Sequence, residues 1–205
     1  MKKEALLIFA KNLKYGHVKT RLAATVGNKK ALSVYKQLLY HTVSITQELK
    51  ADKIVFYSDS INENDVWKNN VYKKQIQDGD TLGMKMENAF KSSFTAGYEK
   101  ILIIGTDCFE LKTDNIMNAF NSLNECDIVI GPAKDGGYYL LGMKKEHPFL
   151  FKNIKWSTNS VLKDTIDICN QNQLSFFLLP ELSDIDEEKD LNRFETQLML
   201  KQKNL

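Results

Sequence analysis

Short, almost uninterrupted apolar runs are the feature that most constrains the fold of this chain. Ile101-Leu-Ile-Ile104 and Ile128-Val-Ile130 are typical of strands that are buried on both faces of a sheet. Such runs alternate with segments of helical periodicity, which predicts an α/β fold with a mainly parallel sheet flanked by helices. Gly131-Pro132 and Gly136-Gly137 separate two adjacent strands, so we expect a reversed strand or hairpin there and a mixed sheet.

The same patterns set the expected boundaries. Strands are predicted near residues 4–10, 52–58, 72–77, 99–106, 127–132, 137–143 and 174–179. Helices are predicted near residues 29–49, 82–96, 113–124, 158–172 and 187–202. The sequence contains no internal repeat, low-complexity tract or clear linker, so we expect residues 1–205 to form a single domain.

The composition narrows the class of protein. Apolar residues make up 43% of the 205, and the net charge of +2 gives no reason to expect nucleic acid or an anionic membrane as a partner. No apolar run approaches the ~20 residues of a membrane span, so a cytoplasmic protein is expected. Cys108, Cys126 and Cys169 fit neither a disulfide framework nor a zinc site. Cys108 follows Asp107 and could be reactive, although a buried thiol is the favoured interpretation.

A basic loop follows the first predicted strand. The segment from Lys11 to Arg21 holds four cationic side chains and no acid, and a helix is expected after it. Free backbone N–H groups and cations at the end of a strand favour phosphate over the alternative of a solvated turn. The glycine patterns of Rossmann and P-loop proteins do not occur, which disfavours both classes.

Carboxylates follow two other strands. Asp107 ends the strand in Gly105-Thr106-Asp107, where it could bind Mg²⁺ or Mn²⁺ together with substrate phosphates. The alternative is a helix cap, but Thr113 and Asp114 lie closer to the expected helix. Asp184 and Asp186 lie two residues apart near the carboxyl end of the chain, and either one could supply a second metal oxygen or cap a helix.

Three further segments have both a structural and a functional interpretation. Asp135-Gly136-Gly137 is either a hairpin turn or a substrate contact walled by Tyr138 or Tyr139. In the segment 77–86, Asp80 or Thr81 is expected to cap a helix, while Gly79 and Gly83 could admit a nucleobase or ribose. Ser157 or Thr158 is expected to be an N-cap, with substrate contact left open.

Several motifs, in this order, resemble those of one family. They are Phe9-Ala-Lys11, Gly16-His-Val-Lys-Thr-Arg-Leu22, Gly105-Thr-Asp-Cys108, Asp135-Gly-Gly-Tyr-Tyr-Leu-Leu-Gly142 and Asp184-Ile-Asp186. The combination resembles the DUF2064 family, whose members are labelled glycosyltransferase-like or selenodomain-associated transferase 1. The resemblance implies the GT-A-like nucleotide-diphospho-sugar transferase fold, which molybdenum-cofactor and 2-phospholactate nucleotidyltransferases share.

The resemblance also implies a set of site residues. The predicted nucleotide-binding residues are Ala10, Lys11, Gly16, Lys19, Arg21, Gln77, Gly79 and Thr106. Asp107 and Asp186 are the implied ligands of Mg²⁺ or Mn²⁺, and Asp135 is an implied acceptor-side residue. Lys19, Arg21 and Asp135 are therefore the candidate catalytic residues.

The sequence thus predicts a metal-dependent transferase that is glycosyltransferase-like. Its expected ligands are a nucleotide sugar or nucleoside triphosphate and a small-molecule acceptor of unknown identity. Two alternatives stay open, namely a nucleotidyltransferase that releases pyrophosphate and a catalytically silent nucleotide-binding module.

Overall fold

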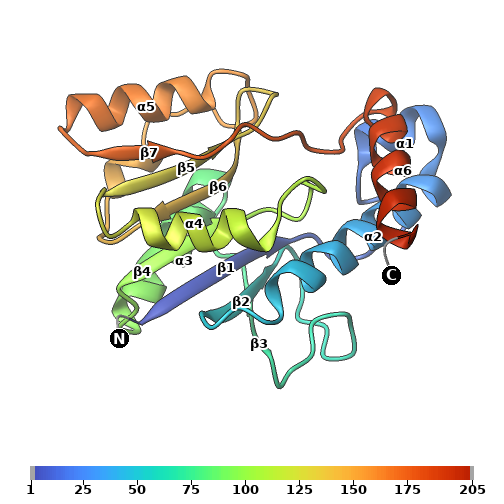
Figure 1. The fold of residues 1–205 in the computed structure, drawn as a ribbon, viewed down its shortest axis with the longest axis horizontal. Helices are drawn as coiled ribbons and strands as arrows, with labels where there is room; N and C mark the ends of the chain where they lie inside the picture. The colour runs from blue at the N-terminus through green and yellow to red at the C-terminus, as the bar shows by residue number, and fades with distance from the viewer. Residues whose placement is uncertain (1–2, 204–205) are drawn as a thin grey trace.

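The computed structural model describes residues 3–203, with side chains through residue 196. Figure 1 shows one sheet with helices on both of its faces. The strands are β1 (Glu4–Ala10), β2 (Asp52–Tyr57), β3 (Tyr72–Ile76), β4 (Lys100–Ile104), β5 (Ile128–Pro132), β6 (Tyr138–Met143) and β7 (Phe176–Leu178). The helices are α1 (Thr20–Val26), α2 (Asn28–Thr46), α3 (Leu82–Thr95), α4 (Thr113–Ser122), η1 (Pro148–Phe151, a 3₁₀ turn), α5 (Val161–Gln171) and α6 (Glu188–Lys203).

The sheet has seven strands in the order β3-β2-β1-β4-β6-β5-β7. Among the strands of residues 3–203, β6 alone runs against its neighbours, pairing antiparallel with both β4 and β5. This confirms the expected mixed, mainly parallel sheet and the hairpin between β5 and β6.

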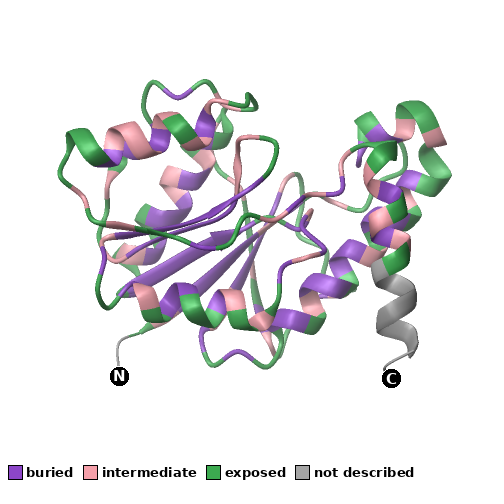
Figure 2. Cartoon of the chain, turned by 45° about the horizontal axis from the view of Figure 1, so that its top comes forward, coloured by how far each residue is buried: buried purple, intermediate pink, exposed green. Residues whose placement is uncertain are grey.

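Alternate residues of β1 enter different halves of the core. Leu6 and Ile8 pack on one face with Leu38 of α2 and Ile116 of α4. The opposite face carries Ala5 and Leu7 against helices α3 and α5, whose buried residues include Phe90 and Cys169. Figure 2 shows the buried strands between these helix layers. Because both faces are covered, the period-two alternation of a half-exposed strand is replaced by the apolar runs seen in the sequence.

Chain order reverses between β1 and β4. The chain runs from β1 to β2 and β3 on one side, then returns to place β4 on the other side of β1. A crevice opens at such a switch point, beyond the carboxyl ends of the strands, and open α/β sheets bind ligands there. These ends point toward the side of the molecule that carries α1 and α6 (Figure 1).

Some local expectations were wrong. The seven-residue helix α1 was not predicted; Gly27, whose φ of 84° suits glycine, separates it from α2, which confirms the helix predicted near residues 29–49. The N-cap of α4 is Lys112, with the Asn115 side chain bound to its backbone N–H, rather than Thr113 or Asp114. The expected N-caps Ser157 and Thr158 precede the start of α5. Thr81 does cap α3, by accepting from the Met84 N–H.

No helix within the described part of the chain is both long enough and apolar enough to cross a bilayer.

We predict that Gly142→Ala destabilises the sheet. A Cβ at this position of β6 would lie 2.2 Å from a methyl of Leu102, which is fully buried on β4. Overpacking of this kind costs about 1–3 kcal/mol of unfolding free energy, measurable by urea denaturation. Gly105→Ala is the matched control, because a Cβ there meets nothing within 4 Å. Equal stability of the two variants would contradict the prediction.

Candidate active site

The most buried charge in the crevice belongs to Lys19. Its ammonium nitrogen lies 2.8 Å from Asp107 Oδ1 and 2.7 Å from Asp186 Oδ1, and its side chain is 4% exposed. Burial alone lowers the pKa of Lys19, but the two carboxylates outweigh it and the pKa is raised. Lys19 therefore stays charged and joins the loop after β1, the end of β4 and the segment before α6.

Lys19 has left-handed backbone geometry, with φ of 49° and ψ of 48°, at the position that precedes α1. This conformation is uncommon for a residue other than glycine. The ion pairs offset its cost, and the reversal of chain direction there aims the side chain into the crevice.

A third carboxylate, Asp184, lies beside this ion triad. Burial raises the pKa of Asp184 to about 7, and the negative charges of Asp107 and Asp186 add to that rise. Lys19 forms ion pairs with two of these three acids. Its single positive charge leaves one of the two paired carboxylate charges unbalanced.

Backbone contacts fix the segment that carries Asp184 and Asp186. The N–H of Ile185 donates to the carbonyl oxygen of Asp107 at 3.0 Å, and the Ile185 side chain is fully buried. The N–H of Ser183 donates to the carboxylate of Glu110 at 2.9 Å. Alternation along this extended segment therefore buries Ile185 and turns its two neighbouring aspartates to the opposite side.

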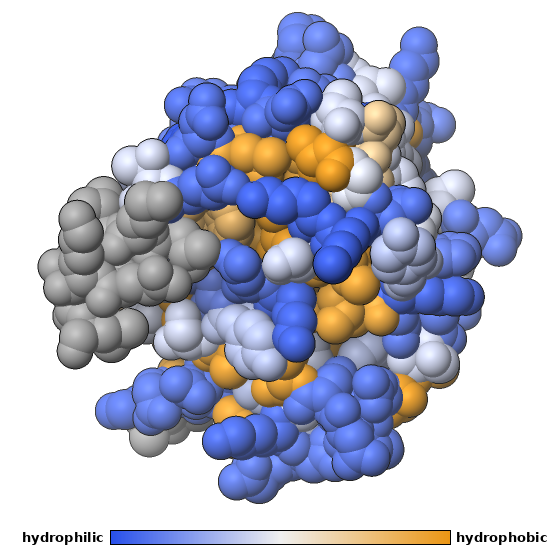
Figure 3. Space-filling view, turned by 90° about the vertical axis from the view of Figure 1, so that its right-hand side faces the viewer, coloured by the Kyte–Doolittle hydropathy of each residue, from blue (hydrophilic) through white to orange (hydrophobic). Residues whose placement is uncertain are grey.

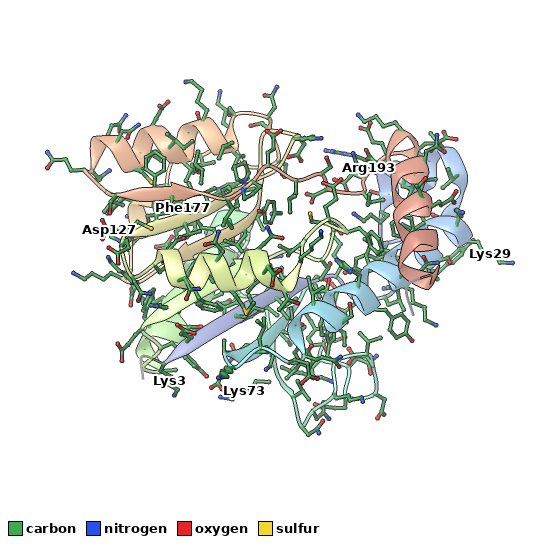
Figure 4. All side chains as sticks on the ribbon, in the orientation of Figure 1. Lys3, Lys29, Lys73, Asp127, Phe177 and Arg193 are labelled. Carbon is green, nitrogen blue, oxygen red and sulfur yellow. The ribbon has the colours of Figure 1, made fainter. Side chains whose placement is uncertain are left out.

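The start of α6 anchors the same segment. Asp190 accepts hydrogen bonds from the N–H groups of Asp186 and Glu187 at 3.0 and 2.9 Å. Arg193, labelled in Figure 4, forms an ion pair of 3.2 Å with Glu110 and donates to the carbonyl oxygen of Asp184. The orientation of the two aspartates thus depends on the docking of α6.

Tyr35 fixes the beginning of the basic loop. Its hydroxyl accepts from the N–H of Lys11 at 2.8 Å, donates to the Lys11 carbonyl at 3.0 Å and lies 3.2 Å from the Thr106 hydroxyl. The residue is almost fully buried on α2, and burial raises the pKa of its phenol. One side chain therefore holds the ends of β1 and β4 together.

A cleft of about 610 Å³ surrounds the ion triad. The basic loop contributes Lys11, Lys19 and Arg21 to one side of it, and Asp107, Asp184 and Asp186 also line it. The other side is formed by Asp135, Gly137, Tyr138, the segment 156–159 and Val161. Figure 3 looks onto the side of the molecule that carries α1 and α6, and it shows hydrophobic residues exposed between hydrophilic ones.

A more apolar cavity of about 410 Å³ adjoins the cleft and shares Lys11, Asp107 and Tyr138 with it. Ala10, Gln77 and Thr106 are part of its lining. The Gln77 side-chain amide donates to the carbonyl oxygen of Phe56 at 3.0 Å, which holds this side chain in place over the end of β2.

The structure brings most of the predicted site residues to these two cavities. Those at one or both are Ala10, Lys11, Lys19, Arg21, Gln77, Thr106, Asp107, Asp135 and Asp186. Gly16 and Gly79 line neither cavity. Each has a positive φ, 77° and 128°, and a Cβ on Gly79 would approach that of Met84 to 2.8 Å, so both residues shape the loops beside the site.

Sequence reasoning did not find every residue of the site. Tyr35 and Leu82 were not singled out, because each resembles an ordinary residue of an amphipathic helix. Trp156 was noted only for the capping residues after it. Cys108 is buried, and burial raises the pKa of its thiol, which agrees with the favoured interpretation of an unreactive cysteine.

Two carboxylates of the cleft are the donors that a divalent cation would use. In the part of the chain that the structure describes, no cluster of three or more His, Cys, Asp or Glu residues is arranged to hold a metal ion by itself. However, oxygens of Asp107 and Asp186 converge on the same point, where the Lys19 nitrogen lies. Magnesium commonly uses one or two carboxylates and completes its shell with water and phosphate oxygens.

Comparison with known proteins supports the fold. Residues 42–158 match the family described as "Uncharacterized protein conserved in bacteria (DUF2064)". A crystal structure from Desulfovibrio desulfuricans G20, provisionally assigned as a nucleotide-diphospho-sugar transferase, is 30% identical with a TM-score of 0.85, covering 91% of this chain and 84% of that one. A search of curated proteins found no match.

More distant structures share the fold alone. The inositol-1-phosphate CTP transferase of T. maritima is 16% identical, with a TM-score of 0.60, over 98% of this chain and 96% of that one. CMP:2-keto-3-deoxy-manno-octonic acid synthetase, solved with CTP, is 8% identical, with a TM-score of 0.62, over 98% of this chain and 100% of that one.

We predict that Tyr35→Phe loosens the basic loop. The change removes a hydroxyl that pairs with both backbone groups of Lys11 and lies beside Thr106. The expected loss is about 1–3 kcal/mol of unfolding free energy, measured by denaturant titration. Tyr40→Phe on the same helix is the control, because Tyr40 is exposed. A loss no larger than that of the control would show that the Tyr35 hydroxyl does not support the loop.

Proposed function

Because the chain belongs to the DUF2064 family and has the nucleotide-diphospho-sugar transferase fold, we propose that it is a metal-dependent transferase acting on a nucleotide sugar or a nucleoside triphosphate. This proposal rests mainly on one observation. Three cations of the loop 11–21 and three aspartates from two distant segments line a single cleft at the switch point of the sheet.

In this proposal the two parts of the nucleotide donor occupy the two cavities. Lys11 and Arg21 bind the phosphates at the basic side of the cleft, with charge-assisted hydrogen bonds. The base and ribose enter the adjoining cavity, where Ala10, Gln77 and Thr106 contact them. Gly16 and Gly79 contribute by shaping the two loops that border the nucleotide.

Asp107 and Asp186 would hold Mg²⁺ or Mn²⁺, which when bound supplies charge neutralisation at the phosphate oxygens. Asp184 lines the same cleft. Lys19, held between its two carboxylate partners in the lining of the cleft, stabilises negative charge on the departing group. Catalysis by these residues comes from positioning and electrostatic stabilisation.

Two reactions fit this machinery. In glycosyl transfer, an acceptor oxygen forms a bond to the sugar carbon as the bond from that carbon to the nucleoside diphosphate breaks. In nucleotidyl transfer, the acceptor oxygen bonds to the α-phosphorus, and pyrophosphate leaves with the electron pair of the broken bond. The second reaction is favoured by the fold shared with proteins named for CTP. In each case the acceptor proton passes to solvent or to Asp135.

The deciding experiment incubates the protein with Mn²⁺, a panel of nucleotides and nucleotide sugars, and a mixture of acceptors. Released nucleoside diphosphate identifies a glycosyltransferase, and released pyrophosphate identifies a nucleotidyltransferase. Nucleotide binding without either product across the panel would favour the silent module instead.

We predict that Asp107→Asn abolishes the Mn²⁺-dependent part of nucleotide affinity. The variant keeps the shape of the side chain and removes one of the two negative charges that face Lys19. The measurement is calorimetric titration with CTP, with and without Mn²⁺. Asp114→Asn, at an exposed residue in the first turn of α4, is the control. Unchanged metal dependence in Asp107→Asn would remove Asp107 from the metal site.

We predict that Arg21→Ala weakens binding of CTP about tenfold or more and leaves cytidine binding unchanged, since only the triphosphate loses a charge-assisted hydrogen bond. Lys14→Ala is the matched control, because Lys14 is an exposed cation of the same loop that lines neither cavity. Equal weakening of CTP and cytidine would assign Arg21 a structural role.

A further inference from the structure

The side of the cleft opposite the basic loop is formed by an irregular segment, residues 152–160, which we call the strap. It joins η1 to α5 and contains two residues with left-handed backbone geometry, Asn153 (φ 60°) and Ser157 (φ 64°). Ser157, Thr158 and Asn159 are exposed, and all three line the cleft. The strap therefore borders the part of the cleft that phosphates bound at the basic loop would not fill.

Close contacts fix the strap at both ends. The Trp156 indole lies against Gly83 of α3, where a Cβ would come within 2.3 Å of the indole nitrogen. The Trp156 ring is edge-on to the ring of Tyr138, with centroids 6.5 Å apart. At the other end, a Cβ on Gly136 would lie 2.1 Å from the carbonyl oxygen of Asn159. Because Gly83 and Gly136 have no Cβ, Trp156 and Asn159 can pack directly against the backbone at these glycines, which fixes both residues in place.

Polar groups without a protein partner face the cleft from this side. Among the residues whose side chains are described, the Ser157 hydroxyl and the Asn159 amide make no intramolecular hydrogen bond, whereas the Thr158 hydroxyl donates to the Lys155 carbonyl at 2.7 Å. Asp135 accepts from the Gly137 N–H through Oδ1 at 2.9 Å, which leaves Oδ2 available. The strap side therefore offers acceptors and donors suited to hydroxyl groups, next to the aromatic surface of Trp156.

The charges that line the strap side restrict the class of ligand that can bind there. All three cations of the cleft lining belong to the basic loop, and the strap side contributes one charged lining residue, the acid Asp135. Lys134, beside Asp135, and Lys152 and Lys155 of the strap do not line the cleft, so a phosphate or carboxylate placed there would face Asp135 with no lining cation on that side, which is unfavourable. A neutral molecule rich in hydroxyl groups avoids that cost.

We propose that the strap, with Asp135 and Tyr138, forms the acceptor subsite, and that the acceptor is an uncharged polyhydroxy compound such as a sugar or polyol without phosphate. This inference rests on the proposed transferase function, since it assigns the remaining half of the same cleft. Trp156 packs against the carbon-bound face of the acceptor, and Asp135 accepts a hydrogen bond from one of its hydroxyls.

The test uses the fluorescence of Trp156 in the full chain. The sequence contains two tryptophans, and Trp67 is 1% exposed, so the difference between the wild type and Trp156→Phe reports on Trp156. Glucose, glycerol and myo-inositol are titrated against their monophosphates, with CTP and Mn²⁺ present and absent. We expect at least one neutral compound to change this signal, and its monophosphate to bind about tenfold more weakly or worse.

Variants separate binding from general structure. Asp135→Asn should weaken binding of the neutral compound about tenfold, because a hydrogen bond to a charged acceptor is lost. Asp114→Asn should leave this binding unchanged. Tighter binding of the monophosphates, no response of Trp156 to any neutral compound, or an unaffected Asp135→Asn variant would each overturn the inference. Calorimetry with CTP on the same samples reports the proposed function separately, so nucleotide binding without polyol binding would refute the acceptor subsite alone.

Discussion

The contact of one buried ammonium with two carboxylates is the interaction on which the site depends. Lys19, Asp107 and Asp186 come from segments separated by up to 167 residues in the chain. An ammonium that is 4% exposed would carry a large desolvation cost without a partner, and it stays charged here because two carboxylates contact it. The triad therefore requires the basic loop and the segment before α6 to meet over the end of β4.

The sheet topology explains why these segments can meet. The reversal of chain order between β1 and β4 leaves a crevice at the ends of two central strands, and Tyr35 bridges those two ends. The antiparallel strand β6 has a second effect, because the hairpin that precedes it brings Asp135 to the same edge of the sheet. The cleft thus combines a charged side from the first half of the chain with a more neutral side from the second half.

Much of the fold could be predicted because it follows from local patterns. Continuous apolar runs such as Ile101–Ile104 specify strands that are covered on both faces, and Gly136-Gly137 specifies the reversal before β6. The short helix α1 and the cap at Lys112 were missed. Lys19, which precedes α1, has left-handed geometry that its residue type does not signal, and Lys112 caps α4 although Thr113 and Asp114 are closer to the usual capping types.

The site was predictable to the extent that charge alone marks it. Lys19, Asp107 and the pair Asp184 and Asp186 could be singled out because ionised side chains at strand ends have few structural roles. The resemblance to a family added the choice of Asp186 and added Asp135, whose spacing alone was equally consistent with a plain hairpin. Tyr35 and Trp156 reach the site through contacts made between distant segments, and no periodicity in the sequence encodes those contacts.

The arrangement of charge also separates the two tasks that the proposed transferase function requires of the cleft. Two carboxylates share one ammonium, which leaves a negative charge that suits a cation arriving with the phosphates. The cations of the basic loop lie on one side, so the phosphates have a single favourable direction of entry. An acceptor that competed for those cations would block the donor, whereas an acceptor held by hydroxyl contacts and Trp156 would not. The proposed neutral recognition on the strap side would therefore complement the proposed anion recognition on the other side.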